Sequence, residues 1–329
     1  MKSKLKGLIG LLSSLLLLGL IFVLLRAKNA DSLLEAWRRL GFLSLFIAVT
    51  CVLGTTLAGA WRLQAIMAIS NNAKSSLASL LRLQLVSQFV AHGAPISALA
   101  DVAKVAILSL RFNLSPGASL RVVVYERVLG AIAIICLGSV AFGFQFLVSV
   151  PLHVLKVEAL VWATGILGIM VLLGLSRFKI VTGIGLLDKA IRGIFTVGHL
   201  LFRPRLSVTL LISSAVQLLL MATAFLVLAE SMHLVVSPLQ LILFMPFVFF
   251  VASLPIFYLG WGGREAAVVL TLGSVSSMTS SEAVALSVAF GVCVLLAALP
   301  GGVFWLMRPS MRKAASDRAA QLQTLSEEN

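Results

Sequence analysis

The segment LPIFYLGWGGREAA, residues 254–267, interrupts a long apolar region with a proline, three glycines and an adjacent Arg-Glu pair. Proline removes a backbone hydrogen-bond donor and obstructs a helix, and glycine lets the backbone turn or approach another group closely. An ionised Arg or Glu at membrane depth costs at least ~2.5–3.5 kcal/mol on insertion scales. Irregular backbone is tolerated there only where it is buried in protein or lines a wet cavity. We therefore interpret the segment as a broken or re-entrant helix at a polar site.

The whole chain has the composition of an integral membrane protein. Of its 329 residues, 60% are hydrophobic and 12% are charged, and the mean hydropathy is +1.08. A soluble domain carries about 25% charged residues, and several apolar runs here approach the ~20 residues that a spanning helix needs. The formal net charge of +14 does not indicate nucleic-acid binding, because Lys and Arg lie mainly in loops, as positive-inside topology predicts. We predict an all-α, polytopic membrane protein.

The sequence contains no pattern that indicates a metal site, a cofactor or a catalytic centre. Its three cysteines are isolated within apolar stretches, and its four histidines are scattered and form no ligand motif. Acidic residues are few and do not cluster in the way that chemistry on a lipid-linked substrate usually requires. We therefore expect no catalytic residues, no bound metal and no cofactor.

The alternation of apolar and polar stretches predicts six full spans and two interrupted regions. The spans are expected over about residues 8–25, 42–60, 120–147, 159–175, 206–228 and 283–307. The interrupted regions are residues 75–111 and 239–277, and the basic loop between them is expected to contain an amphipathic helix over residues 180–194. Loop charge places both termini in the cytoplasm. Each interrupted region must then begin and end on one side of the membrane.

Both interrupted regions are accordingly predicted to be helical hairpins, either re-entrant or made of two short spans, one opening inward and the other outward. For residues 75–111 a surface amphipathic helix is the alternative. The chain is expected to form a single transmembrane domain, residues 1–307, with halves 1–150 and 151–307 and a polar cytoplasmic tail, residues 308–329. Each half reads as two spans, a hairpin and a further span. Inverted repeats with interrupted segments at matching positions are the best sequence indication of a transport site near the midplane.

The first half also carries charged residues at unusual depth. Asp101 and Lys104 are three residues apart, so on a helix they share a face and can pair. Glu126 and Arg127 are adjacent, about 100° apart on a helix, so each needs a partner elsewhere. Arg62 follows a tryptophan at the expected end of a span, a pattern that fits an interface anchor and a functional residue equally well.

These motifs resemble the lysylphosphatidylglycerol synthase transmembrane region family of flippase-like membrane proteins. Pro255 followed by GWGGREA, residues 260–266, resembles the family's Pro…Gly-x-Gly-x-Arg-Glu signature. Pro95 followed by DVAK, residues 101–104, is similar to its first-half motif of a proline and then Gly-Gly-Asp-x-x-Arg. The chain departs from that motif, because Lys104 replaces the arginine and Leu99-Ala100 replaces the glycine pair.

The resemblance extends to the following helix and over nearly the whole chain. Glu126-Arg127 looks like the family's Glu-Arg pair, and Trp61-Arg62 looks like its Arg-Trp anchor. No aminoacyl-transferase domain accompanies these motifs, so the resemblance implies a stand-alone member that moves or handles a lipid. It implies a bacterial cytoplasmic (inner) membrane protein whose partner is an anionic phospholipid, a polyprenyl-phosphate-linked lipid or a hopanoid. Assembly as a homo-oligomer is left open.

We expect a lipid flippase or transporter, with positive charge for a phosphate headgroup from Lys104, Arg127 and Arg264. Nearby carboxylates would balance these charges while the site is empty, since an unpaired buried charge is strongly unfavourable. The expected substrate-binding residues are Pro95, Asp101, Lys104, Glu126, Arg127, Pro255, Gly262, Gly263, Arg264 and Glu265. The alternatives are a non-catalytic partner subunit of a lipid or glycan pathway, a membrane enzyme, and charge pairs that only hold helices together.

Overall fold

The computed structural model describes residue 35 and residues 37–70, 75–93, 98–175, 196–254 and 260–307. This part of the chain is helical and contains no strand, which confirms the all-α fold. Its main helices are α3 (Phe42–Ser70), α4 (Leu77–Gly93), α5 (Ala98–Arg111), α6 (Pro116–Gly143), α7 (Leu152–Leu175), α9 (Pro204–Ser231), α10 (Pro238–Ser253), α11 (Gly263–Leu270), α12 (Leu272–Val275) and α13 (Ser280–Leu306). A short 3-10 helix, η1 (Gln145–Leu147), follows α6.

Within the described ranges, five helices are long and apolar enough to cross a membrane: α3, α6, α7, α9 and α13. They confirm five of the six expected spans and make the chain a multi-pass membrane protein. The remaining expected span, residues 8–25, lies outside the described residues. The same holds for the expected amphipathic helix over residues 180–194 and for the tail, residues 308–329.

Local sequence sets where several helices begin. The Ser115 side chain accepts a hydrogen bond from the backbone of the first turn of α6, and a proline with a helix-compatible φ follows it. Ser237 and Thr279 cap α10 and α13 in the same way. At these two helices the side-chain oxygens of Gln240 and Glu282 accept a hydrogen bond from the N–H of the cap residue, which completes a capping box.

Helix α3 is longer than the sequence suggested. It continues past Arg62 to Ser70, so the expected end of this span at Arg62 is wrong. The physical reason is that Leu63, Ile66 and Met67 are apolar at helical spacing and are buried in the core. Arg62 is therefore enclosed within a helix instead of marking its end.

Each interrupted region contains two short helices that pack against each other, α4 with α5 and α10 with α11, and the second region also includes α12. At ~1.5 Å per residue, α4 extends ~25 Å and α5 ~21 Å, less than the ~30 Å of a hydrocarbon core. Helix α4 also packs against α3 and α13, which excludes a helix lying on the surface of the bundle. The hairpin prediction is thus confirmed for residues 75–111. The connection in each hairpin includes residues outside the described ranges.

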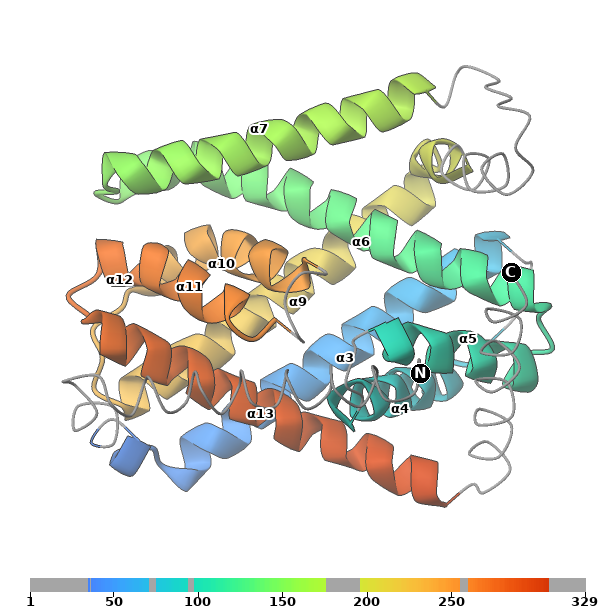
Figure 1. Ribbon diagram of the computed structural model, residues 1–329, viewed down its shortest axis with the longest axis horizontal. Coiled ribbons are helices and arrows are strands. Elements are labelled where there is room, and N and C mark those ends of the chain that lie inside the picture. The colour runs from blue at the N-terminus through green and yellow to red at the C-terminus, as the bar shows by residue number, and fades with distance from the viewer. Residues whose placement is uncertain are drawn as a thin grey trace, which may run out of the picture.

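The helix pairings repeat between the two halves. Helix α4 packs on α13, the last helix of the second half, while α10 packs on α6, the last described helix of the first half. The pairings α5–α6 and α11–α13 correspond in the same way, as do α3–α4 and α9–α10, and α3 and α9 pack on each other. Figure 1 shows α3 and α9 running in opposite directions, and likewise α6 and α13. These relationships are those of an inverted repeat.

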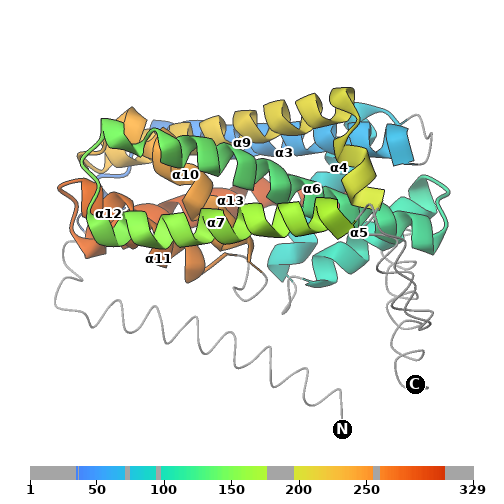
Figure 2. The same ribbon diagram turned by 90° about the horizontal axis from the view of Figure 1, so that it is seen from above.

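Helices α3 and α9 pack closely at two glycines of α3. A Cβ at Gly54 would lie 2.9 Å from Cδ1 of Leu220, and a Cβ at Gly59 would lie 3.2 Å from Nε2 of Gln217. Figure 2 shows α3 and α9 along one edge of the bundle and α5 and α11 towards the opposite edge. The second arms of the two hairpins are therefore on the same flank, away from the α3–α9 contact.

The first hairpin is held against α13 by a second pair of glycines. A Cβ at Gly301 would lie 2.0 Å from the backbone oxygen of Leu85, and a Cβ at Gly302 would lie 2.6 Å from the Phe89 ring. Helix α13 continues through Pro300 to Leu306. The two glycines consequently let α4 and α13 approach until backbone and side chain are in contact.

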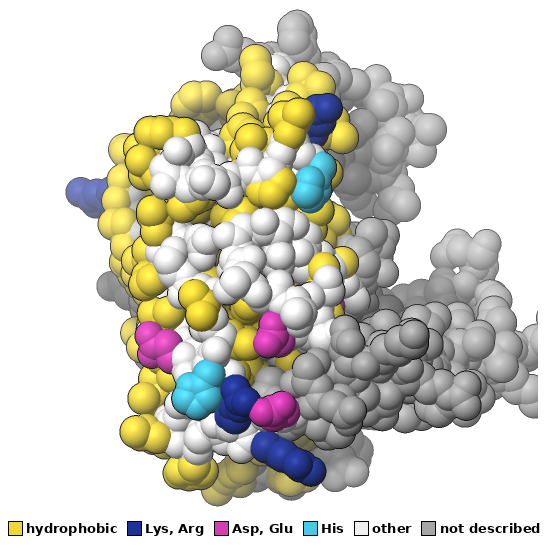
Figure 3. Space-filling model, turned by 90° about the vertical axis from the view of Figure 1, so that its left-hand side faces the viewer, with side chains coloured by type: hydrophobic (Ala, Val, Ile, Leu, Met, Phe, Trp, Pro, Cys, Tyr) yellow, Lys and Arg dark blue, Asp and Glu magenta, His cyan; other side chains and the backbone are white. Residues whose placement is uncertain are grey.

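The end of the bundle near α12 carries few charged side chains. Figure 3 looks at this end and shows them scattered, with both signs present, among apolar and uncharged polar surface. At the other end, Arg121 of α6 and Arg205 of α9 are exposed near the first residues of their helices. The asymmetry of positive charge follows the pattern by which loop charge sets membrane orientation.

Candidate functional site

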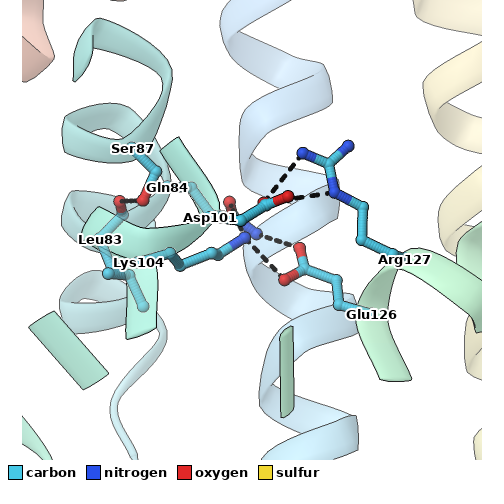
Figure 4. Close-up of polar contacts among 7 residues, drawn as sticks. All are labelled: Leu83, Gln84, Ser87, Asp101, Lys104, Glu126 and Arg127. Carbon is cyan, nitrogen blue, oxygen red and sulfur yellow. Dashed lines mark hydrogen bonds and ion pairs between the residues drawn. The ribbon is translucent and has the colours of Figure 1, made fainter. Parts of the chain in front are cut away.

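The first hairpin contributes two side chains to a buried ring of three polar groups. Lys104 of α5 donates through Nζ to Oε2 of Glu126 on α6 at 2.6 Å and to Oε1 of Gln84 on α4 at 2.8 Å. Gln84 in turn donates through Nε2 to Oε1 of Glu126 at 2.7 Å. All three residues are less than 9% exposed. The ring, which we call the Lys104 cluster, ties together three helices (Figure 4).

Arg62 of α3 lies beside this cluster, in the interior between α3, α6 and α9. Its Nη1 donates weakly to Oγ of Ser214 at 3.3 Å and to Oε1 of Gln217 at 3.4 Å. Its guanidinium packs against Gly130 of α6, where an added Cβ would lie 3.4 Å from Nη1. Its Nε is buried and has no hydrogen-bond partner among the described residues. The structure therefore favours a functional or packing role for Arg62 over an interface anchor.

Asp101 and Arg127 form a separate pair on the surface of the hairpin. Arg127 donates to Oδ1 of Asp101 at 2.9 Å through Nη2 and at 3.3 Å through Nε. The two side chains are 36% and 61% exposed, so this pair contributes little to stability. The expected pairing of Asp101 with Lys104 is wrong, because α6 supplies each of them with a partner. Glu126 and Arg127 bind different partners, as their ~100° separation requires.

The second hairpin carries a more compact cluster on α11 and α13, which we call the Arg264 cluster. Arg264 donates through Nη2 to Oε1 of Glu265 at 2.8 Å and through Nε to Oγ of Ser287 at 3.0 Å. The Ser287 hydroxyl donates to the same Glu265 oxygen at 2.9 Å. All three residues are buried. Adjacent Arg and Glu side chains can meet here because α11 is only starting at this point.

Glycine and glutamate together build the start of α11. Gly260 and Gly262 have φ of +81° and +84°, a conformation that costs glycine little and other residues much more. Oε2 of Glu265 accepts a hydrogen bond from the Gly262 N–H at 2.6 Å, and Gly263 is the first residue of the helix. The glycine-rich signature thus forms the sharp turn that brings Arg264 and Glu265 into the bundle.

Two aromatic rings flank the Arg264 guanidinium. Its Cζ lies 5.0 Å from the centroid of the Trp261 ring and 5.5 Å from that of Phe290, within the range of cation–π attraction. A Cβ at Gly291 would lie 2.6 Å from Nη2 of Arg264 and 2.7 Å from Trp261. Glycine at this position of α13 therefore leaves the space that the arginine and the tryptophan occupy.

The two clusters occupy corresponding places in the two halves but do not join. Each pairs a cation on the second arm of a hairpin with a residue of the span that follows it, and the Lys104 cluster adds Gln84 from the first arm. Ser287 and Gly301 are 14 residues apart on α13, or ~21 Å at 1.5 Å per residue, and Gly301 packs beside Leu85, the neighbour of Gln84. Among the described residues, no hydrogen bond or ion pair links Arg264 with Lys104 or Arg127.

Eight of the ten expected site residues are described, and the structure places six of them on the two hairpins and Glu126 and Arg127 on α6, the span that follows the first hairpin. Pro95 and Pro255 lie outside the described residues. Sequence reasoning missed Gln84 and Ser287 as partners of the buried charges. Gln84 was visible as a polar interruption of an apolar stretch, whereas a serine within an apolar span carries no such signal.

The architecture defines a class: a multi-pass helical membrane protein with two inverted hairpins, each holding a buried ion pair. The chain matches the family model described as "Lysylphosphatidylglycerol synthase TM region" over residues 8–302, and it belongs to that family. This confirms the resemblance that the sequence motifs indicated. A search of curated proteins found no match to the chain.

Proposed function

We propose that this protein moves a lipid with an anionic, phosphate-bearing headgroup across the membrane. The observation that carries the proposal is the pair of buried ion-pair clusters at equivalent positions of an inverted repeat. Ionisable groups inside membrane helices are expensive and usually mark a substrate or ion pathway. Interrupted segments at matching places of inverted repeats are where transporters bind their substrates.

The contacts within the clusters suggest how a headgroup would be accommodated. Glu126 neutralises Lys104, and Glu265 neutralises Arg264, so each of these two buried cations has a counter-charge. A phosphate that reached either cluster would replace a carboxylate as partner of the cation. Arg62, whose Nε–H has no partner among the described residues, offers a further donor beside the Lys104 cluster. The acyl chains would remain in the bilayer.

The separation of the clusters supports alternating exposure. Glu126 is 10 residues from the first residue of α6, or ~15 Å, and Ser287 is 7 residues from the first residue of α13, or ~11 Å. Because α6 and α13 run in opposite directions (Figure 1), the clusters are offset towards opposite ends of the bundle. We propose that the end with the exposed arginines is cytoplasmic. The headgroup would then pass from the Lys104 cluster to the Arg264 cluster, or in reverse.

The test is translocation of a fluorescent anionic phospholipid in proteoliposomes, with a quencher applied to the outer leaflet. Wild-type protein should increase the fraction quenched over time, and Arg264→Ala and Lys104→Met should reduce the rate to that of protein-free liposomes. Arg205→Ala is the matched control, because it removes an exposed arginine and should leave the rate unchanged. Thermal unfolding of each variant would show that it is folded.

Three outcomes would count against the proposal in different ways. A wild-type rate in Arg264→Ala would remove Arg264 from the mechanism. Equal loss in Arg205→Ala would show that bulk positive charge matters and the clusters do not. Translocation that requires a second protein would instead support the role of a partner subunit in a lipid or glycan pathway.

A further inference from the structure

A cavity of about 280 Å³ lies between α4, α5 and the last turn of α13, outside both clusters. Arg82 of α4, Arg111 of α5 and Phe304 of α13 line it, and its remaining walls are apolar: Leu83, Val86, Ile107 and Met307. None of the described residues that line the cavity carries a carboxylate. The combination is that of a small amphipathic site with two cations and a hydrophobic floor.

Arg82 is exposed and forms no ion pair with a described residue. Its Cζ lies 5.8 Å from the centroid of the Phe304 ring, so the ring supports the guanidinium without neutralising it. A guanidinium presents N–H groups in a fork that matches the oxygens of a phosphate. Two arginines that line one cavity therefore favour a phosphate over an uncharged ligand.

The position of the cavity matches the level of lipid headgroups. Arg82 lies in the second turn of α4 and Arg111 is the last residue of α5, so both are near helix ends at the same end of the bundle as Arg121. The volume is at the small end for ligand sites, enough for a headgroup and not for a whole lipid. Acyl chains would leave over the apolar wall and the exposed Met307.

We propose that this cavity binds the phosphate group of an anionic lipid headgroup. Arg111 lies two turns after Lys104 on α5 and shares its face, since seven residues complete nearly two turns. Leu83 of the cavity adjoins Gln84 of the Lys104 cluster. A phosphate held here would therefore sit next to the buried cluster, at the mouth of the pathway. The binding itself does not require translocation, so each proposal can fail without the other.

Binding can be measured by thermophoresis of the purified full chain in detergent with dioctanoyl phosphatidylglycerol. The variant Arg82→Gln/Arg111→Gln should weaken binding at least about tenfold, as expected for loss of charge-assisted hydrogen bonds. Arg121→Gln is the matched control: it removes an exposed arginine at the same end and should change affinity less than about twofold. Met307→Trp keeps both arginines but fills the mouth, and should weaken binding without a change of charge.

Two further ligands show which chemical group the cavity recognises. Dioctanoylglycerol lacks the phosphate and should bind at least about tenfold more weakly than phosphatidylglycerol. Glycerol 3-phosphate tests a soluble source, because competition by it at similar concentration would assign the site to free phosphate esters instead of lipid. Unchanged affinity in both cavity variants, equal loss in Arg121→Gln, or equal affinity for dioctanoylglycerol would each overturn the proposal. If the double variant is unfolded, the affinity of Met307→Trp for dioctanoyl phosphatidylglycerol tests the proposal instead.

Discussion

Lys104 and Arg264 hold corresponding positions: each lies on the second arm of a hairpin, buried, and each binds a residue of the span that follows. Lys104 binds Glu126 of α6, and Arg264 binds Ser287 of α13. They differ in where the counter-charge resides. Glu126 comes from another helix, whereas Glu265 is the immediate neighbour of Arg264. The Lys104 cluster therefore ties α5 to α6 by charge, and the Arg264 cluster is neutral within one helix.

Breaking the Lys104–Glu126 pair from one side should be costly. Lys104→Met leaves Glu126 buried with only Gln84 as partner, and we expect a loss of ~3–5 kcal/mol in the free energy of unfolding. The double variant Lys104→Met/Glu126→Leu should recover most of it, because both charges are removed, but should stay inactive in translocation. Thermal unfolding in detergent measures both effects. Asp101→Asn, at the exposed pair, should cost less than ~1 kcal/mol. A Lys104→Met variant as stable as the wild-type protein would contradict this account.

Gly291→Ala should destabilise the Arg264 cluster. The new methyl group would lie 2.6 Å from Nη2 of Arg264 and 2.7 Å from Trp261, so one of them must move, at ~1–3 kcal/mol. Gly168→Ala on α7 is the control, since nothing lies within 4 Å of that Cβ. It should be neutral or stabilise the helix by up to ~1 kcal/mol. Differential scanning fluorimetry of the two variants checks the difference, and equal melting temperatures would show that the cluster has room to adjust.

Glu158 on α7 should tolerate an amide better than a methyl group. Its Oε2 accepts from Nε2 of Gln145 at 2.8 Å and from Nε1 of Trp162 at 3.3 Å, while Glu158 Oε1 and Gln145 Oε1 are buried and have no donor among the described residues. Glu158→Gln supplies an N–H₂ donor and should keep or raise the melting temperature. Glu158→Ala strands the donors of Gln145 and Trp162 and should cost ~1–3 kcal/mol. The reverse order of stability would show that Glu158 needs its charge.

The proposed orientation can be read from cysteine labelling. Val235 is 72% exposed in the loop before α10, and Arg121 is exposed near the start of α6. In a background without the three native cysteines, Val235→Cys should react with a membrane-impermeant maleimide added to intact cells. Arg121→Cys should react only after permeabilisation. The opposite pattern would reverse the assignment of the two ends.

The hairpins were predictable because their composition is costly in a membrane. Proline, glycine and adjacent charges within apolar stretches are tolerated only in protein-lined surroundings, so they mark interrupted segments even in a single sequence. The turn at Gly260 and Gly262 follows from the same argument. The spans were predictable from length and hydropathy alone, since apolar runs of that length have few alternatives.

The partners of the charges were not predictable, because they depend on how helices rotate against one another. Spacing on α5 suggested that Asp101 and Lys104 pair, but α6 presents Arg127 to one and Glu126 to the other. Arg62 was misplaced for a related reason. Its position after a tryptophan resembled a boundary, and only the packing of the following turns shows that α3 continues through it.

The contact of α3 with α9 restricts the route that a lipid could take. At Gly54 and Gly59 the side chains of α9 already lie against the α3 backbone, so these two helices leave little space for a headgroup between them. If the protein moves a lipid as proposed, the headgroup would pass along the flank that carries α5 and α11 (Figure 2), with its acyl chains in the bilayer. The α3–α9 contact would then close one side of the headgroup path, and the lipid need never be fully enclosed by protein.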